Sequence, residues 1–356
     1  MDIEKLAAKH VQDLVPYQSA RRIGGHGHTF LNANESPKSE LYFFNSTTLN
    51  RYPDCQPQEV VTAYADYANV RPENVLVSRG SDEAIGLIVR TFCEQHEEGI
   101  VIAPPTYGMY EVAANTNGAL IAKAKRNDDF TLSVSAIEDA INNASFKVKA
   151  VFIDSPANPL GIIFNKDALI ELLTKFPDTF IVMDEAYIEY APKYTVVDLI
   201  KTYPNLIVLR TLSKAYALAG IRCGFAIADA AVIKLLTKVI DPYPIPDPVA
   251  QVARQALASG GKDLMKIRVA LTLKRRDILE SALLSLPIVK KVYPSEANFL
   301  LVQFADGPKI FNAVAQKGII LRSFDNKPGL KDCIRISIGS DEELDELMRT
   351  LSTITL

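Results

Sequence analysis

Between residues 75 and 228 short apolar runs alternate with stretches of helical spacing, and this alternation constrains the fold more than any other feature. The runs have the length of strands and are nearly continuously apolar, which is typical of a parallel sheet buried on both faces. We therefore expect an α/β fold, with a mostly parallel sheet sandwiched by helices. Only a short segment separates the last two runs, which allows one antiparallel strand there. The runs are VLVS (75–78), IVIA (100–103), KAVFID (149–154), FIVMD (180–184), LIVLR (206–210) and GFAIA (224–228).

A proline-rich segment, DPYPIPDP at 241–248, ends this alternating region. Prolines at that density continue neither a helix nor a central strand, so the segment marks a linker or a domain crossing. A long basic helical stretch and several shorter elements follow, which predicts a smaller α/β domain. We expect an N-terminal arm over 1–35 that contributes to the small domain, a large domain over 36–245 and a small C-terminal domain over 246–356.

Composition and charge narrow the class of protein. A net charge of −3 and a pI near 5.9 argue against a nucleic-acid surface. No apolar run approaches the length of a membrane span, and the N-terminus lacks the pattern of a secretory signal. Four cysteines lie far apart without a CxxC motif, which indicates reduced thiols rather than disulfides or a zinc site. We therefore expect a cytoplasmic protein with neither a nucleic-acid nor a membrane partner.

Polar residues follow four of the predicted strands where each strand ends. Ser81, Asn158, Asp184 and Lys214 all come directly after such runs. Ligands bind at the carboxyl ends of strands in open parallel sheets, so these side chains are expected to meet. Taken singly, Ser81 is an ordinary helix cap and Asn158 a turn residue. Asp184 is harder to dismiss, because a carboxylate after four apolar residues needs a hydrogen-bonding or cationic partner.

The stretch RTLSKAYALAGIRCG, residues 210–224, places Lys214 among small and apolar residues with Arg222 eight positions later. A lone lysine is usually a surface residue. Together with Asp184 and the phosphate-binding potential of a helix start, the set matches another chemistry. A lysine amine forms a Schiff base with an aldehyde, and an aspartate keeps a pyridine nitrogen protonated. These are the requirements of pyridoxal 5′-phosphate (PLP).

With these motifs the chain resembles the PLP-dependent aminotransferases of fold type I, class I/II, over almost its whole length. The resemblance implies the PLP-dependent transferase fold, and three motifs narrow it to members that act on histidinol phosphate. It thus implies a transamination in histidine biosynthesis. One amino/keto pair is L-histidinol phosphate and imidazole-acetol phosphate, and the other is glutamate and 2-oxoglutarate. The narrowing motifs are LNANE (31–35), RYPDCQP (51–57) and PPTYGMY (104–110). The others are PYQSARR (16–22), VSRGSDEA (77–84), ANPLG (157–161), DEAYIE (184–189), TLSKAYALAGIRCG (211–224), IILRSF (319–324) and IRISIG (334–339).

The same resemblance implies roles for single residues. Lys214 is expected to carry the cofactor and then move the proton, Asp184 to pair with the pyridine nitrogen, and Tyr187 to complete the catalytic set. The large domain is the expected PLP-binding domain. The cofactor ring is expected to contact Tyr107, Asn158 and Tyr187, and its phosphate Ser81, Asp82, Ser213 and Arg222.

The resemblance also implies a homodimer and an anion-binding set for the substrate. Tyr52 is expected to reach the cofactor site of the neighbouring subunit, and Tyr17, Arg322 and Arg335 to bind the anionic end of the substrate. Without the resemblance, Tyr52 and Tyr107 are equally well turn aromatics beside prolines. Arg335 alone suits the polar face of a half-buried strand.

Some features depart from the family pattern or leave alternatives. SPANPLG has Ala157 and Leu160 where SPNNPTG is common, which we expect to change turn hydrogen bonds without abolishing cofactor binding. His26 and His28 in GGHGH lack a third ligand nearby, so a surface turn is favoured over a metal site. Three other functions remain open: an aromatic amino acid aminotransferase, a threonine-phosphate decarboxylase on the same fold, and a non-catalytic PLP-binding module.

Overall fold

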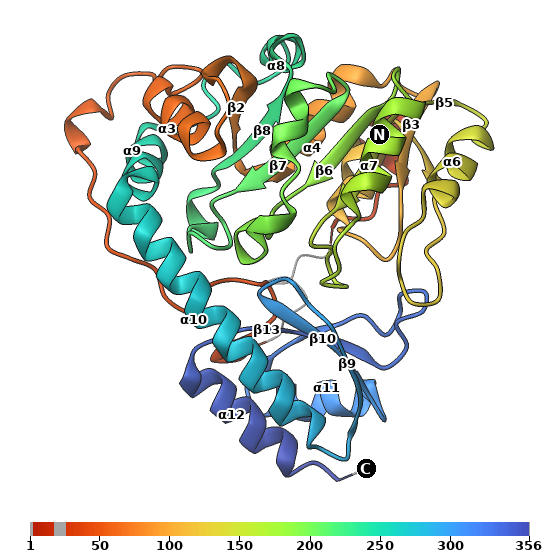
Figure 1. Ribbon diagram of the computed structural model, residues 1–356, viewed down its shortest axis with the longest axis vertical. Helices are drawn as coiled ribbons and strands as arrows, with labels where there is room; N and C mark the ends of the chain where they lie inside the picture. Colours follow the sequence, from red (N-terminus) through yellow and green to blue (C-terminus); the bar gives the residue numbers. More distant parts are fainter. Residues whose placement is uncertain (1–2, 18–25, 356) are drawn as a thin grey trace.

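The computed structural model describes residues 3–17 and 26–355 (Figure 1), so Gln18–Arg22 of the PYQSARR motif lie outside the described residues. A seven-stranded sheet forms the larger body, in the order β2-β8-β7-β6-β5-β3-β4. Strand β8 is antiparallel to both neighbours and the other pairs are parallel, as the short segment before it allowed. The expected fold class is thus confirmed. The strands are β2 (Val75–Ser78), β3 (Glu98–Ile102), β4 (Leu120–Lys123), β5 (Lys147–Asp154), β6 (Phe180–Asp184), β7 (Leu206–Thr211) and β8 (Gly224–Ala228).

Both faces of this sheet are buried under helices, which explains the continuous apolar runs. In β6, Ile181 and Met183 face one core and Val182 faces the other. Successive strand residues point to opposite faces, so a strand covered on both sides needs apolar residues throughout. One face is covered by α4 (Gly80–Phe92), α5 (Met109–Thr116) and α8 (Ala230–Thr237). The other is covered by α3 (Gln58–Ala68), α6 (Val134–Asn142), α7 (Lys166–Lys175) and α9 (Asp247–Leu257).

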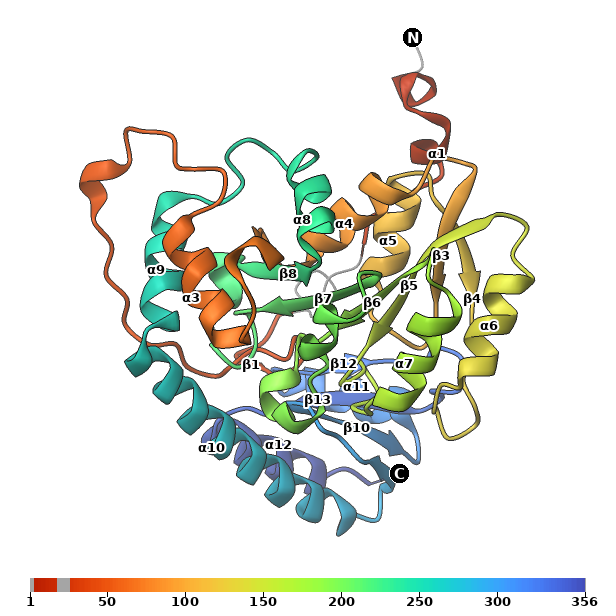
Figure 2. The same cartoon turned by 45° about the horizontal axis from the view of Figure 1, so that its top comes forward.

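A second body is built on a four-stranded antiparallel sheet in the order β12-β13-β10-β9. The long helix α10 (Ser259–Leu284) runs from the larger body to this one, and α12 (Asp341–Ser352) lies beside it (Figures 1 and 2). A short strand near the N-terminus, β1 (Thr29–Phe30), pairs in parallel with β11 (Ile319–Ile320). The remaining elements are β9 (Val289–Tyr293), β10 (Phe299–Phe304), β12 (Arg322–Ser323), β13 (Cys333–Ser337), α11 (Gly307–Gln316) and the short α1 (Lys9–Gln12).

An apolar cluster joins the loop after β5 to the second body. Ala157 and Leu160 are 1% and 2% exposed and pack with Leu301, Leu330 and Cys333. The two residues that depart from the family pattern therefore lie in a contact between the loop after β5 and the second body, where apolar side chains are favoured. Among the described residues, no helix has both the length and the apolar character needed to span a membrane.

Candidate active site

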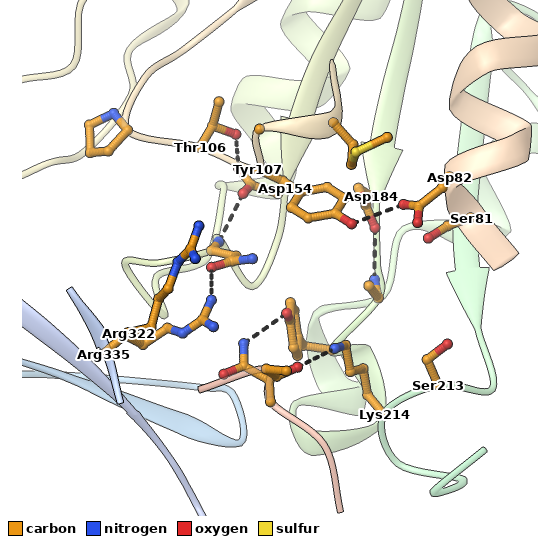
Figure 3. A pocket seen from close by; sticks show the side chains of 18 of the residues that line it. Ser81, Asp82, Thr106, Tyr107, Asp154, Asp184, Ser213, Lys214, Arg322 and Arg335 are labelled. Atoms are coloured by element: carbon orange, nitrogen blue, oxygen red, sulfur yellow. Dashed lines mark hydrogen bonds between the residues drawn. The ribbon is translucent and has the colours of Figure 1, made fainter. Parts of the chain in front are cut away.

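A cavity of about 600 Å³ opens at the carboxyl ends of the central strands, beside the second body. Segments from both bodies line it, and Figure 3 shows the side chains that point into it. Every site residue predicted from the sequence except Tyr52 lines this cavity. They are Tyr17, Ser81, Asp82, Tyr107, Asn158, Asp184, Tyr187, Ser213, Lys214, Arg322, Arg335 and Arg222.

Lys214 lies just after β7 and its amine reaches into the cavity. The Nζ donates a hydrogen bond to the carbonyl oxygen of Ala33 at 2.9 Å and lies 5.7 Å from the centre of the Tyr187 ring. Burial, helped by the charge of Arg335, lowers the pKa of Lys214 to about 8. A substantial fraction of this amine is therefore neutral near physiological pH, as a nucleophile or a proton acceptor must be.

Asp184 ends β6 and is 4% exposed. Its Oδ2 accepts a hydrogen bond from the hydroxyl of Tyr110 at 2.8 Å, and its Oδ1 accepts one from the backbone N–H of Ala186 at 3.0 Å. Neither partner carries a positive charge, and burial raises the pKa of Asp184 to about 7. Such a carboxylate favours a cationic ligand atom.

The start of α4 forms a cup suited to an anion. Gly80 has φ +71°, and a Cβ there would lie 2.6 Å from a terminal nitrogen of Arg222. Gly224 of β8 lies directly against the backbone at the start of α4, where a Cβ on Gly224 would clash with the backbone nitrogen of Ser81. Ser213 lies 3.4 Å from Arg222 Nη1. Helix N–H groups, hydroxyls and a guanidinium together form a phosphate-binding set.

Asp82 connects this cup to an aromatic side chain. Its Oδ1 accepts a hydrogen bond from the hydroxyl of Tyr107 at 2.9 Å, and its Oδ2 accepts one from Arg222 at 3.1 Å. One carboxylate thus fixes the position of a tyrosine ring and of the arginine of the cup. The ring of Tyr107 also meets that of Tyr110 edge to face at 5.7 Å.

The N-terminal segment closes one wall of the cavity. Asn34 donates from Nδ2 to the hydroxyl of Tyr187 at 2.9 Å. Ser337 of β13 holds Asn34 from the other side, accepting from its backbone N–H and donating to its Oδ1. Burial raises the pKa of Tyr187 to about 12, so its hydroxyl stays protonated. Tyr187 is therefore held as a proton donor at the cavity wall.

Two arginines approach from the second body. Arg322 of β12 and Arg335 of β13 are register partners in an antiparallel pair. Arg335 is buried and donates to Oδ1 of Asn158 and to the carbonyl oxygen of Asn32, while its Nε has no hydrogen-bond partner. Tyr17 lies over Gly108 beside them. A pair of arginine forks on neighbouring strands suits a carboxylate or phosphate.

Two predicted features lie elsewhere. Tyr52 is 81% exposed and stacks on Tyr243 at 4.4 Å, outside the cavity of its own chain. His28 pairs with Glu346 at 2.7 Å, and His26 is exposed. No group of three metal-ligating residues occurs within residues 3–17 and 26–355.

The structure adds three residues that sequence reasoning missed. Tyr110 contacts Asp184, while Asp154 ends β5 in register with Asp184 and faces Arg126. Asp154 follows an apolar run in the same way as Asp184, and that position was the available signal. Tyr110 is the last residue of the PPTYGMY motif, but its helical position is an ordinary apolar one and did not indicate a contact with Asp184. Arg126 lies in a connecting loop and carried no signal.

In chemical terms the cavity combines an amine with a lowered pKa, a buried carboxylate without a cationic partner, an anion-binding helix start and a pair of arginines. The Aminotransferase class I and II family model matches residues 27–351. The chain is 51% identical to the histidinol-phosphate aminotransferase of Aeromonas salmonicida, over 99% of this chain and 98% of that protein. It is 48% identical to histidinol-phosphate aminotransferase 1 of Pasteurella multocida, over 99% of this chain and all of that protein.

The fold is also that of a solved structure, the histidinol-phosphate aminotransferase of Sinorhizobium meliloti in complex with pyridoxal-5′-phosphate. The TM-score is 0.84 at 23% identity, over 98% of this chain and 96% of that chain. At this identity the likeness concerns the fold alone.

Proposed function

The chain belongs to the class I and II aminotransferases, and we propose that it exchanges an amino group between histidinol phosphate and 2-oxoglutarate. The products are imidazole-acetol phosphate and glutamate, and the reaction is a step of histidine biosynthesis. The observation that carries the proposal is one cavity that unites Lys214, Asp184 and the pair Arg322 and Arg335. The identity of 51% over nearly the whole chain supports the substrate.

The residues of the cavity fit PLP as the cofactor. When bound, PLP supplies an aldehyde that condenses with amines and a pyridine ring that accepts the electrons of a cleaved bond at the substrate α-carbon. Asp184 is a buried carboxylate without a cationic partner among its hydrogen bonds, and it would hold a protonated ring nitrogen. Arg222, Ser213 and the backbone of Ser81 and Asp82 would hold the phosphate.

Asn158, Tyr187 and Tyr107 would hold the ring itself. Arg335 donates to Oδ1 of Asn158, so the Nδ2 group of Asn158 is oriented as a donor for a ring oxygen. The hydroxyl of Tyr187 is a second donor, and Asn34 fixes its position. Tyr107, anchored by Asp82, would stack on the ring face.

Lys214 would bind the cofactor covalently and then act as the base at the substrate α-carbon. Its pKa of about 8 lies near physiological pH, so part of the amine is neutral and the neutral form is still basic enough to accept the proton. The carbonyl oxygen of Ala33 accepts from the amine and keeps it beside the Tyr187 ring. Burial of the site keeps water from competing for the proton.

Arg335 and Arg322, with Tyr17, would bind the anionic end of each substrate. A single pocket must accept the carboxylate of glutamate and the phosphate of histidinol phosphate. An arginine fork binds either group through two parallel hydrogen bonds. The same residues thus serve both half-reactions.

We also propose a homodimer in which Tyr52 completes the site of the partner. Its exposure of 81%, its stacking on exposed Tyr243 and the exposed apolar residues of the preceding segment support this proposal. Those residues of the preceding segment are Leu41, Phe43, Phe44 and Leu49. The division into an N-terminal arm, a large and a small domain stays a prediction, as does the cytoplasmic location. The pairing of β1 with β11 supports the N-terminal arm as part of the small domain. Helix α9, which the prediction assigns to the small domain, packs against α3 on the large sheet instead.

The visible absorption spectrum of the PLP-loaded protein tests the proposal. Addition of L-histidinol phosphate without a keto acid should remove the visible band and raise that of bound pyridoxamine phosphate. A response to L-phenylalanine alone would favour an aromatic aminotransferase. Release of carbon dioxide from O-phospho-L-threonine would favour a decarboxylase, and a protein that does not bind PLP would overturn the proposal.

A further inference from the structure

A second buried carboxylate lies beside Asp184, and the function described above gives it no part. Asp154 ends β5 and is the register partner of Asp184 on the neighbouring strand β6. It is 4% exposed and lines the same cavity. Burying a second carboxylate at this point is costly unless the group has partners.

The two oxygens of Asp154 hold two different loops. Oδ1 accepts a hydrogen bond from the hydroxyl of Thr106 at 2.9 Å, and Oδ2 accepts one from the backbone N–H of Asn158 at 2.8 Å (Figure 3). Thr106 directly precedes Tyr107, the proposed stacking residue, and Asn158 is the proposed donor to a ring oxygen. One side chain thus fixes the loops that carry two ring contacts.

Arg126 supplies the countercharge for Asp154 from the loop after β4. Its side chain is 5% exposed, with Nη2 at 3.5 Å from Oδ1 of Asp154. Its Nε donates to the carbonyl oxygen of Ala103 at 2.9 Å and its Nη1 to that of Phe130 at 3.2 Å. Burial raises the pKa of Asp154 and the charge of Arg126 opposes that rise. The two oxygens can then both accept, as the geometry shows.

A buried ion pair of this kind is poor evidence for a gain in stability. A protein in which well-packed apolar side chains replace such a pair is often equally stable or more stable. The pair is better explained as a means of orienting the Thr106 hydroxyl and the Asn158 N–H, because one carboxylate accepts a hydrogen bond from each. An apolar side chain at position 154 would leave the Asn158 N–H and the Thr106 hydroxyl without their acceptor.

We propose that Asp154, held by Arg126, is a positioning residue for PLP, because it fixes Asn158 and the Thr106–Tyr107 segment for contact with the cofactor ring. The inference rests on the proposed binding of PLP in this cavity and does not depend on the identity of the substrate.

Asp154→Asn tests the inference with little change in shape. Asparagine carries one acceptor oxygen, one NH₂ group and no charge, so the Asn158 N–H and the Thr106 hydroxyl can no longer both donate to it, and the bond that remains is not charge-assisted. The probe is PLP, titrated into the apoprotein and followed by absorbance or tyrosine fluorescence well below the unfolding temperature. The dissociation constant for PLP should rise about tenfold or more, as expected for loss of a hydrogen bond to a charged group. Asp178→Asn makes the same chemical change at an exposed residue and should leave it unaltered.

A double variant separates positioning from stability. Asp154→Asn leaves Arg126 buried without a countercharge and should lower Tm. Combining it with Arg126→Met removes that charge, so Tm should recover in part, because the carbonyl oxygens of Ala103 and Phe130 lose their donor, while PLP affinity stays weak. Recovery of both quantities would show that the pair serves stability alone and would overturn the inference. An unchanged PLP dissociation constant in Asp154→Asn would overturn it as well.

Thr106→Val covers the case in which Asp154→Asn does not fold. This variant removes the hydroxyl that donates to Asp154 and leaves the ion pair in place. The PLP dissociation constant should rise about three- to tenfold, and no change would contradict the inference. If the unaltered protein itself fails to bind PLP, the proposed function fails. If it binds PLP and the variants bind equally well, only this inference fails.

Discussion

The Nζ of Lys214 donates a hydrogen bond to the carbonyl oxygen of Ala33 at 2.9 Å, although 181 residues separate the two. The bond ties the amine at the centre of the cavity to the N-terminal segment, which in turn contacts β13 through Asn34 and Ser337. The position of the reactive amine therefore depends on contacts with both bodies. Its pKa of about 8 depends on this arrangement, because burial and the charge of Arg335 both lower it.

Lys214→Ala should abolish turnover while PLP still binds. The anion cup and Asp184 remain, so PLP is held without a covalent bond, but the base at the α-carbon is gone. We expect kcat to fall by a factor of about 10³ or more. Dialysis against PLP-free buffer with steady-state assays checks both parts, and Lys201→Ala, at an exposed lysine, is the control. Normal transamination by Lys214→Ala would refute the central assignment.

Arg335→Lys should impair both half-reactions. Lysine keeps the charge but not the planar fork, and the hydrogen bonds to Asn158 and Asn32 are lost. KM for glutamate and for histidinol phosphate should both rise about 10- to 100-fold, equivalent to about 1.4–2.8 kcal/mol. Arg254→Lys alters an exposed arginine that pairs with Glu59 and should have no effect. A rise confined to one substrate would mean that Arg335 does not serve both anions.

Asp184 should make the stability of the apoprotein depend on pH. Burial raises its pKa from 3.8 to about 7, so the folded protein binds this proton more tightly than the unfolded chain does. The stabilisation is fully present below about pH 4 and is lost as the pH rises through 7, with a magnitude of roughly 2–4 kcal/mol. Tm of the apoprotein should therefore fall more between pH 5 and 8, on the order of a few degrees, than Tm of Asp184→Asn.

Two comparisons sharpen that measurement. Glu189 is also buried with a pKa raised to about 7, so it contributes equally to both proteins and cancels in the difference. PLP should flatten the pH dependence of the unaltered protein, because a cationic ring nitrogen favours the ionised carboxylate. Equal pH slopes for the two apoproteins would show that Asp184 ionises freely in the empty cavity.

Subunit complementation should reveal the role of Tyr52. Tyr52→Ala and Lys214→Ala should each be nearly inactive, because each lacks one part of every site. A mixed dimer has one site with both residues intact, so reassociated subunits should recover about a quarter of the full activity. Activity assays after mixing under mild denaturation check this, and sedimentation gives the oligomeric state. Mixtures that stay inactive while hybrids form would remove Tyr52 from the partner's site.

Leu160→Thr should destabilise the protein even though threonine is the common residue of the family pattern. Leu160 is 2% exposed in an apolar cluster with Leu301 and Leu330. Threonine would lose apolar contacts there and would place a hydroxyl among apolar side chains. The free energy of unfolding should fall by about 1–3 kcal/mol, measured by urea denaturation. Leu284→Thr, at a leucine that is 60% exposed, should change it little. An unchanged urea midpoint for Leu160→Thr would show that the contact is loose.

The sequence predicted the central sheet because strands covered on both faces leave continuous apolar runs. Strand β4 escaped prediction, since its residues LIAK lie at the sheet edge and are only partly buried. Lys214, Asp184, Asn158 and Ser81 were predicted to meet because the ends of parallel strands converge at one edge.

Contacts between distant segments were beyond sequence reasoning. Tyr110 contacts Asp184 across 74 residues, and its own position in α5 follows the ordinary apolar spacing of a helix. Arg126 finds Asp154 only because β4 and β5 flank β3 in the sheet. Such pairings depend on how the whole chain packs, and no local pattern encodes them.

The hydrogen bond from Arg335 to the carbonyl oxygen of Asn32 joins two segments that the ribosome synthesises far apart in time. The ribosome releases residues 75–228, with the anion cup, Asp184 and Lys214, well before it synthesises Arg322 and Arg335. The residues proposed to hold the cofactor are thus synthesised before the two arginines proposed to bind the substrate. Its N-terminal segment must wait for β11 and β13, so the segment made first is among the last to find its native neighbours.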